Sequence, residues 1–157
     1  MKVQGCTIIG LSKPNCSRSC CTKISSAARA LNFAEPLSNA LADDCRPELM
    51  PRSISELLYP APYHDALQKY AVTRNVDPFF VLSIARQESR FDAKVKSFAA
   101  ARGLLQFIAS TSSQIARQLN LGDFEQDDLY DPNKAILIGS QYMQNLFTEF
   151  GHPQAVA

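Results

Sequence analysis

The sequence predicts a mainly α-helical domain, and three patterns support this expectation. In several segments apolar residues recur at intervals of three and four, which is the spacing of one helix face. Two segments open with Asp-Pro, at Asp77 and Asp131, and aspartate followed by proline is a typical helix start. The alternation of apolar and polar residues that marks a β-strand never extends beyond a few residues. We therefore expect helices joined by loops.

Length and charge point to one domain without a nucleic-acid or membrane partner. The 157 residues suit a single domain, because domains commonly hold ~100 to 200 residues. With 16 basic and 15 acidic residues, the net charge is +1, which indicates neither nucleic-acid binding nor a polybasic membrane segment. No apolar run approaches the ~18 residues of a transmembrane helix. The apolar stretch 6–11 is shorter than the ~7 to 15 residues of a signal-peptide core, so no signal peptide is predicted.

Residues 1–56 are expected to form a leader or linker outside the main domain. All five cysteines lie in the first 45 residues, at Cys6, Cys16, Cys20, Cys21 and Cys45. Their number and spacing fit neither a paired disulfide framework nor a zinc site. The alanine-rich segment 24–34 could form a helix that Pro36 would end. Five prolines between residues 35 and 62 indicate a connector with at most one short helix.

The main domain is expected to open with two helices. The first should run from about Tyr63 to Thr73, where apolar residues keep a helical spacing. Asp77 should cap the second, which starts at Pro78 and reaches about Ser89. This second helix is apolar on nearly all sides, which predicts a buried central helix.

Further helical elements are expected after a loop from residue 90 to about 99. A short helical turn should cover residues 103–107, and Ser110 or Thr111 could then cap a helix that reaches Asn120. The last long helix should follow the second Asp-Pro pair and end at Gly151. The acidic residues between 123 and 131 lack the spacing of a calcium loop, so we interpret them as an exposed loop and a helix cap.

Glu88, in the last turn of the expected buried helix, is the candidate for acid catalysis. A carboxylic acid where a buried helix meets a cleft is partly desolvated, which favours its protonated form. Such an acid can give its proton to a leaving group. Most glutamates at the end of a helix are surface residues, so the position alone does not distinguish the two roles.

Glu88 lies in one of five stretches that stand out in order along the chain: Tyr59-Pro-Ala-Pro-Tyr63, Ser83-Ile-Ala-Arg-Gln-Glu-Ser-Arg-Phe91, Val95-Lys-Ser-Phe-Ala-Ala-Ala-Arg-Gly-Leu-Leu-Gln-Phe107, Leu129-Tyr-Asp-Pro-Asn133 and Ile136-Leu-Ile-Gly-Ser-Gln-Tyr-Met143. In their spelling and order these stretches resemble the soluble, Slt-type lytic transglycosylases, which cleave bacterial peptidoglycan. The resemblance implies a lysozyme-like, goose-type helical domain over residues 57–157. Residues 1–56 could then be the remnant of a helical solenoid.

The resemblance implies that Glu88 acts twice, first as acid and then as base. It would protonate the β-1,4 bond between N-acetylmuramic acid and N-acetylglucosamine. It would then take a proton from the 6-hydroxyl of the muramic acid, which closes a 1,6-anhydro ring without added water. The implied partner is the glycan strand of peptidoglycan, and the implied workplace is the periplasm or cell envelope. No metal or organic cofactor is implied.

The resemblance also assigns substrate-binding roles to Ser89, Gly103, Leu105, Gln106 and Tyr142. Ser89 could orient the acid or the sugar, or simply bond the backbone. Gly103 would permit close backbone approach, and Gln106 would point into the sugar groove. Leu105 stands where the family usually has methionine. Tyr142 could bond the acid, stack on a sugar or belong to the core.

In the family, an Ala-Tyr-Asn motif that completes the far wall of the site follows the position of Ala157. We therefore expect a domain that is incomplete at its C-terminus. Alternative functions therefore stay open. The chain could be a weakly active or inactive glycan-binding fragment, or a helical interaction module with a protein partner in the cell-wall machinery. Hydrolysis by water is a further alternative to ring closure.

Overall fold

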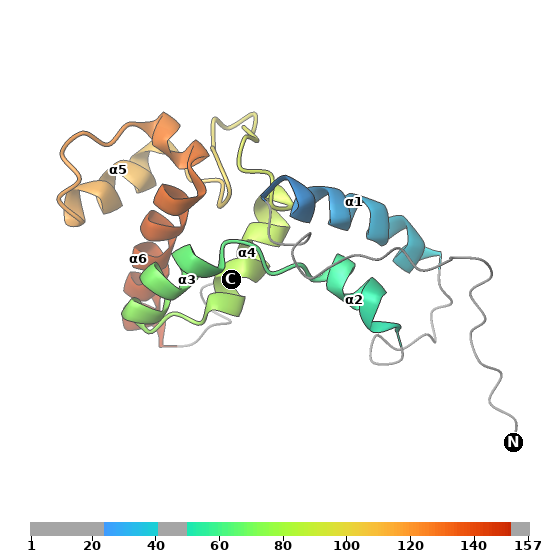
Figure 1. Ribbon diagram of the computed structural model, residues 1–157. Coiled ribbons are helices and arrows are strands. Elements are labelled where there is room, and N and C mark those ends of the chain that lie inside the picture. The colour runs from blue at the N-terminus through green and yellow to red at the C-terminus, as the bar shows by residue number, and fades with distance from the viewer. Residues whose placement is uncertain (1–23, 41–49, 152–157) are drawn as a thin grey trace, which may run out of the picture.

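The structure is a computed structural model that describes residues 24–40 and 50–151. Within these residues the regular elements are helices, and the only β-structure is two isolated bridges (Figure 1). The α-helices are α1 (Ile24–Asn39), α2 (Arg52–Leu58), α3 (His64–Tyr70), α4 (Pro78–Ser89), α5 (Ala109–Gln118) and α6 (Pro132–Phe150). Two 3₁₀ helices are η2 (Val72–Arg74) and η3 (Gln126–Tyr130). The expected mainly helical fold is confirmed, while the five cysteines lie outside the described residues.

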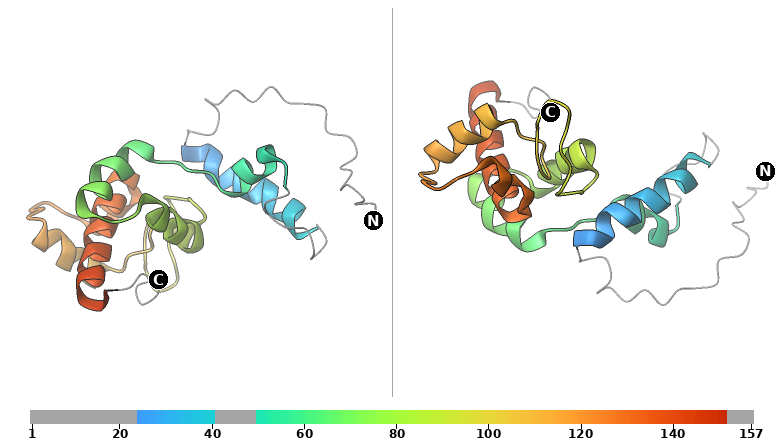
Figure 2. Two further views of the ribbon diagram at one scale, coloured as in Figure 1. Left: turned by 90° about the horizontal axis from the view of Figure 1, so that it is seen from below. Right: turned by 90° about the horizontal axis from the view of Figure 1, so that it is seen from above.

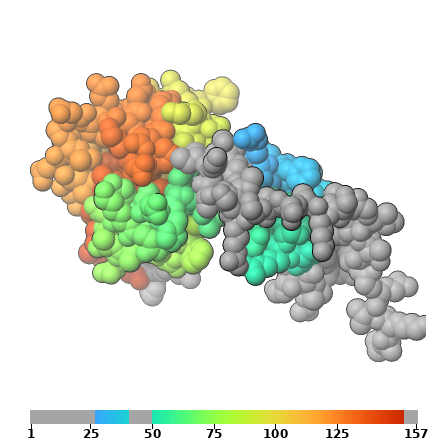
Figure 3. All heavy atoms as spheres, viewed as in Figure 1, coloured from blue at the N-terminus to red at the C-terminus, as the bar shows by residue number. Residues whose placement is uncertain are grey.

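Helix α6 is the centre of the main body, which comprises residues 63–151. Helices α3, η2, α4, α5 and η3 all pack against it, and Figure 3 shows them as one closely filled mass. Ile136 and Ile138 of α6 are fully buried, as are Leu104 and Leu129. Since burying such a side chain contributes about 1.5–3 kcal/mol, these contacts fix the elements that surround the site.

Helices α1 and α2 pack against each other at one flank of the main body (Figure 2). In both views of Figure 2 they lie on the side of α4 that faces away from α6. Ala27 and Leu31 of α1 are buried and belong to the hydrophobic core cluster. Pro36 does not end α1, contrary to the sequence prediction. The proline removes one N–H from the ladder, but its carbonyl accepts from the N–H of Ala40 at 3.1 Å, so the helix continues.

Both Asp-Pro helix starts are confirmed. The Asp77 carboxylate accepts from the N–H of Phe79 at 2.8 Å, and Asp131 accepts from the N–H of Asn133 at 3.0 Å. Helix α6 ends at Gly151, whose φ of 74° is easy only for glycine. Helix α4, however, is not buried on all sides, because Phe79 is 73% exposed.

Two further local predictions are wrong. Residues 102–107, hereafter the site turn, form a tight turn rather than a helical one. The N–H of Arg102 donates to Phe107 O at 3.0 Å, and left-handed φ angles at Gly103 and Gln106 exclude a helix. Helix α5 starts after Ile108, and no side chain caps it, so neither Ser110 nor Thr111 has that role.

No helix within residues 24–40 and 50–151 combines the length and the hydropathy needed to cross a membrane.

Candidate active site

Glu88 lies in a groove of about 250 Å³ between α4, the site turn, the start of α5 and α6. The structure brings Glu88 together with Leu105, Gln106 and Tyr142, four of the six residues singled out in the sequence. The other lining residues are mostly apolar: Phe80, Ile84, Phe107, Ile108, Thr111, Met143 and Leu146. Glu88 is the only carboxylic acid of the set, in a groove whose other lining residues are mostly apolar.

Glu88 itself is exposed, which corrects the expectation that the cleft would partly desolvate it. The reason is its place in the last turn of α4. Its apolar neighbours in the groove, Ile84 and Phe80, precede it by one and two turns on the same helix face. The described residues therefore cover this face of α4 at Phe80 and Ile84 and leave the Glu88 carboxylate open to solvent.

The end of α4 is fixed by a strained backbone and by a buried serine. Arg90 and Phe91 both adopt left-handed φ angles, 53° and 63°, which is unusual for non-glycine residues. The Ser89 hydroxyl lies 2.8 Å from Leu104 O in the site turn and 3.0 Å from Ala85 O in α4. Ser89 is buried and is not among the residues that line the groove. Of the two roles considered for Ser89, its hydrogen bonds fit the one in which it bonds the backbone. They join the end of α4 to the site turn.

Gly103 supports the site turn from behind rather than from the groove. It is buried with a φ of 76°, and a Cβ built on it would overlap the carbonyl oxygen of Leu129. The expected close backbone approach is present, but toward η3. On the other side, a Cβ on Gly139 of α6 would overlap the Cδ1 atom of Leu105. The two glycines let the site turn fit between η3 and α6.

Gln106 lines the groove, while its side-chain amide holds the site turn closed. The Nε2 atom donates to Gly103 O at 2.8 Å and to Val95 O at 3.2 Å. Both acceptors are main-chain oxygens, so the amide nitrogen is directed into the loop. A carboxamide oriented in this way leaves its oxygen as the atom able to meet a ligand.

Tyr142 has both core and groove contacts. Its ring meets the ring of Phe107 edge to face, with centroids 5.5 Å apart, a favourable arrangement for aromatic pairs. Tyr142 is half-buried. The ring of Phe80, which also lines the groove, packs on the ring of Phe147 with centroids 5.3 Å apart. These pairs join α4, the site turn and α6.

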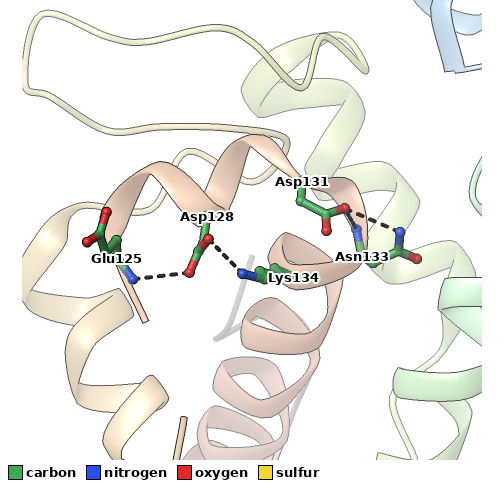
Figure 4. A network of polar contacts seen from close by, with 5 residues as sticks. All are labelled: Glu125, Asp128, Asp131, Asn133 and Lys134. Carbon is green, nitrogen blue, oxygen red and sulfur yellow. Dashed lines mark hydrogen bonds and ion pairs between the residues drawn. The ribbon is translucent and has the colours of Figure 1, made fainter. Parts of the chain in front are cut away.

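The acidic segment before α6 is largely exposed and caps α6 through Asp131, as the sequence predicts, but it also forms η3 and contacts the site turn. Glu125 and Asp128 form a reciprocal capping box around η3, and Asp128 also pairs with Lys134 at 2.6 Å (Figure 4). The hydrogen bond from Lys134 lowers the pKa of Asp128, and the same bond raises the pKa of Lys134. The signal that sequence reasoning missed is the three-residue spacing of these two acids, which is that of a capping box.

The next residues of this segment reach the site turn directly. Asp127 forms an ion pair with Arg102, and the Gln126 amide donates to Ala100 O at 3.1 Å. Arg102 is the residue whose backbone closes the turn. The acidic segment therefore holds the loop at the point where it enters the site turn.

Tyr63 is a second contributor that sequence reasoning did not identify. Its hydroxyl donates to Phe91 O at 3.3 Å, just beyond the end of α4. Burial, with a smaller contribution from the nearby carboxylate of Asp92, raises the pKa of Tyr63 to about 12. The only signal in the sequence is its place in the Tyr59-Pro-Ala-Pro-Tyr63 stretch.

Within the described residues, no group of three or more His, Cys, Asp or Glu side chains could hold a metal ion.

Comparisons with known proteins identify similar sequences and folds. The soluble lytic murein transglycosylase of Salmonella typhimurium is 30% identical over 100 residues, which are 63% of this chain and 16% of that protein. The protein of the same name from Escherichia coli K12 is 30% identical over 95 residues, 60% of this chain and 15% of that one. The chain thus spans about one sixth of the length of these curated relatives.

Solved structures show the same fold. The 70 kDa soluble lytic transglycosylase of Escherichia coli matches with a TM-score of 0.58 and 31% identity over 61% of this chain and 16% of that one. Lytic transglycosylase Slt of Pseudomonas aeruginosa matches 82% of this chain and 20% of that one, with a TM-score of 0.62 and 18% identity. The family described as "Transglycosylase SLT domain" matches residues 65–157. Since this match covers more than half of the sequence, the chain belongs to the transglycosylase SLT domain family.

Proposed function

We propose that this chain acts as part of a lytic transglycosylase that cleaves the β-1,4 bond between N-acetylmuramic acid and N-acetylglucosamine in peptidoglycan. The observation that carries the proposal is the groove, in which Glu88 is the one carboxylic acid and lies with Gln106 and Tyr142. Family membership and relatives named as murein transglycosylases support the substrate class.

The proposed reaction needs one carboxyl group. The Glu88 carboxyl protonates the glycosidic oxygen while the bond from that oxygen to C1 of the muramic acid breaks, which leaves an oxocarbenium-like centre. The Glu88 carboxylate then takes the proton of the 6-hydroxyl as this oxygen bonds to C1. Glu88 regains its proton, and no water is added. The product is a 1,6-anhydro sugar that is one water lighter than the product of hydrolysis.

An exposed carboxylate fits this scheme if the substrate itself completes the enclosure. A glycan strand over the groove would cover Glu88 and exclude water from it, which strengthens proton transfer and electrostatic contacts. The Gln106 oxygen and the Tyr142 hydroxyl are the groups we assign to bind the sugars. We propose that Ser89, Gly103 and Leu105 shape the groove.

Domain limits and location follow from the same proposal. We assign residues 57–157 to the catalytic domain, and residues 1–56 to a leader or to the end of a helical solenoid. An enzyme that acts on murein works in the periplasm or cell envelope, with glycan strands as its partner. A protein partner in the cell-wall machinery is the remaining alternative.

In the decisive experiment, purified peptidoglycan is incubated with the protein and the masses of the products are measured by mass spectrometry. The unaltered chain is expected to release anhydromuropeptides, and Glu88→Gln should reduce the rate at least about 100-fold, because general acid–base catalysis contributes ~10²–10⁴. Glu149→Gln, at an exposed glutamate of α6 outside the groove, is the matched control.

Three other results would argue against the proposal. Products heavier by one water would indicate hydrolysis. Glycan binding without any product would favour the glycan-binding fragment. Turnover by Glu88→Gln at the unaltered rate would remove Glu88 from the chemistry.

A further inference from the structure

Glu35 of α1 forms ion pairs with two arginines of the helix end that carries Glu88. Its Oε1 atom lies 3.6 Å from Arg86 Nη2, and its Oε2 atom contacts Arg90 Nη2. The Glu35 side chain is only 26% exposed. These contacts link a helix that precedes the family match to the last turn of α4.

Arg86 is enclosed from a second side. Its guanidinium carbon lies 4.9 Å from the ring centroid of Tyr59, the residue that follows α2. The Nε atom of Arg86 is buried without a hydrogen-bond partner among the described residues. Arg86 is therefore held between α1 and the end of α2, and its position depends on Glu35 for charge compensation.

The helix period places this contact behind Glu88. Arg86 and Arg90 are one turn apart on the same face, while Glu88 is two residues from each, or about 200° around the helix at ~3.6 residues per turn. Figures 1 and 2 show α4 between α1 on one side and α6 on the other. Glu35 thus holds the back of the helix whose front carries the acid.

This end of α4 needs external support. Arg90 and Phe91 hold left-handed φ angles that non-glycine residues rarely adopt. Arg86 and Arg90 also repel each other as like charges four residues apart. Glu35 offsets one of these two positive charges and lies between them, and it holds the Arg90 side chain at the point where the chain leaves the helix.

We propose that Glu35 is a positioning residue: its ion pairs with Arg86 and Arg90 fix the end of α4 and thereby the orientation of Glu88 in the groove. The proposal rests on the proposed function of Glu88 as the acid. It assigns to the α1–α2 pair a role in catalysis that the groove alone does not reveal.

The test compares Glu35→Gln and Glu35→Lys with Glu56→Gln and Glu56→Lys. Glu56 is a matched control, since it is 57% exposed and its ion pair among the described residues is with Arg52 of the same helix. On peptidoglycan, Glu35→Gln should lower kcat about 10-fold and Glu35→Lys more, with KM within about 2-fold, because small misplacements of a catalytic group cost up to ~100-fold. The control variants should keep kcat within 2-fold of the unaltered chain, as roughly expected for a surface pair.

A smaller folded fraction would also lower kcat, so a second property must be measured. Misfolding lowers the rate equally at every pH, whereas a displaced Glu88 should change the shape of the pH profile of kcat. NMR gives an answer even without turnover: the three-bond couplings that report the Glu88 χ1 rotamer should change in Glu35→Gln and stay constant in Glu56→Gln.

Glu88→Gln, measured in parallel, separates the two proposals. If Glu88→Gln stays active, the proposed function fails. If Glu88→Gln is inactive while the Glu35 variants keep full kcat and an unchanged pH profile, only the positioning role fails. Unchanged Glu88 couplings in both Glu35 variants would likewise overturn it.

Discussion

At the residue scale, the site turn is set by what lies behind it. Gly103 and Gly139 leave room for Leu129 O and for the Leu105 side chain, respectively. A side chain at either position would collide with these atoms and displace the site turn relative to the groove. The roles of these glycines are therefore structural, and the groove depends on them through Leu105 and Gln106.

Gly103→Ala tests this directly. The new methyl group would meet backbone, which cannot rotate away, and alanine would have to hold a φ of 76°. We expect a loss of about 2–5 kcal/mol in the free energy of unfolding, from left-handed strain plus overpacking. Urea titration followed by circular dichroism measures it.

Gly122→Ala is the control for this change, because nothing lies within 4 Å of the added Cβ. It should be neutral or gain up to ~1 kcal/mol through the unfolded state. Equal effects of the two substitutions would show that Gly103 is not constrained by Leu129.

At the element scale, the helices that begin with a local capping signal were predicted correctly. Asp77 and Asp131 cap α4 and α6 as expected, since an N-cap needs only neighbouring residues. The site turn was mispredicted because its conformation depends on distant groups: Gly103 bonds Val95, and η3 closes it from behind. Glu88, Gln106 and Tyr142, which the family resemblance singles out, line one groove. The resemblance did not predict the exposure of Glu88, because that exposure depends on how three elements are arranged.

The loop that leads into the site turn contains a strained alanine. Ala100 has a φ of 60°, and its N–H donates to Ser97 O at 3.0 Å in a tight turn. Ala100→Gly removes the left-handed penalty of roughly 1–2 kcal/mol but adds unfolded-state entropy, so we expect a net gain of about 0.5–1 kcal/mol. The shift in the urea midpoint measures this gain.

Ala99→Gly is the matched control for the loop, since Ala99 is exposed and has no positive φ. Here glycine should only destabilise, by ~0.4–1 kcal/mol. A loss of stability in both variants would mean that position 100 carries no strain.

At the scale of the whole molecule, the end of α4 is where the separate parts of the fold meet. Glu35 reaches it from α1, Ser89 joins it to the site turn, and Tyr63 joins it to the start of α3. Tyr63 itself holds a φ of 64°. Losing one of these contacts at the end of α4 should therefore lower the stability of the fold. The contact of Tyr63 can be weakened without mutation, by ionising its hydroxyl.

Alkaline titration should weaken the junction through Tyr63. Its pKa is raised from 10.0 to about 12 in the folded chain, by burial first and by Asp92 second. A raised folded pKa means that this contribution to stability is complete below pH 10 and is lost as the pH rises from about 10 to 12. In Tyr63→Phe the hydrogen bond to Phe91 O is absent at every pH, so this variant should be less stable than the unaltered chain at neutral pH and lack the alkaline loss. Urea midpoints at several pH values measure the difference between the two proteins, in which all other ionising groups cancel. The difference should shrink above pH 10, and a difference that stays constant would show that the Tyr63 hydroxyl does not hold the junction.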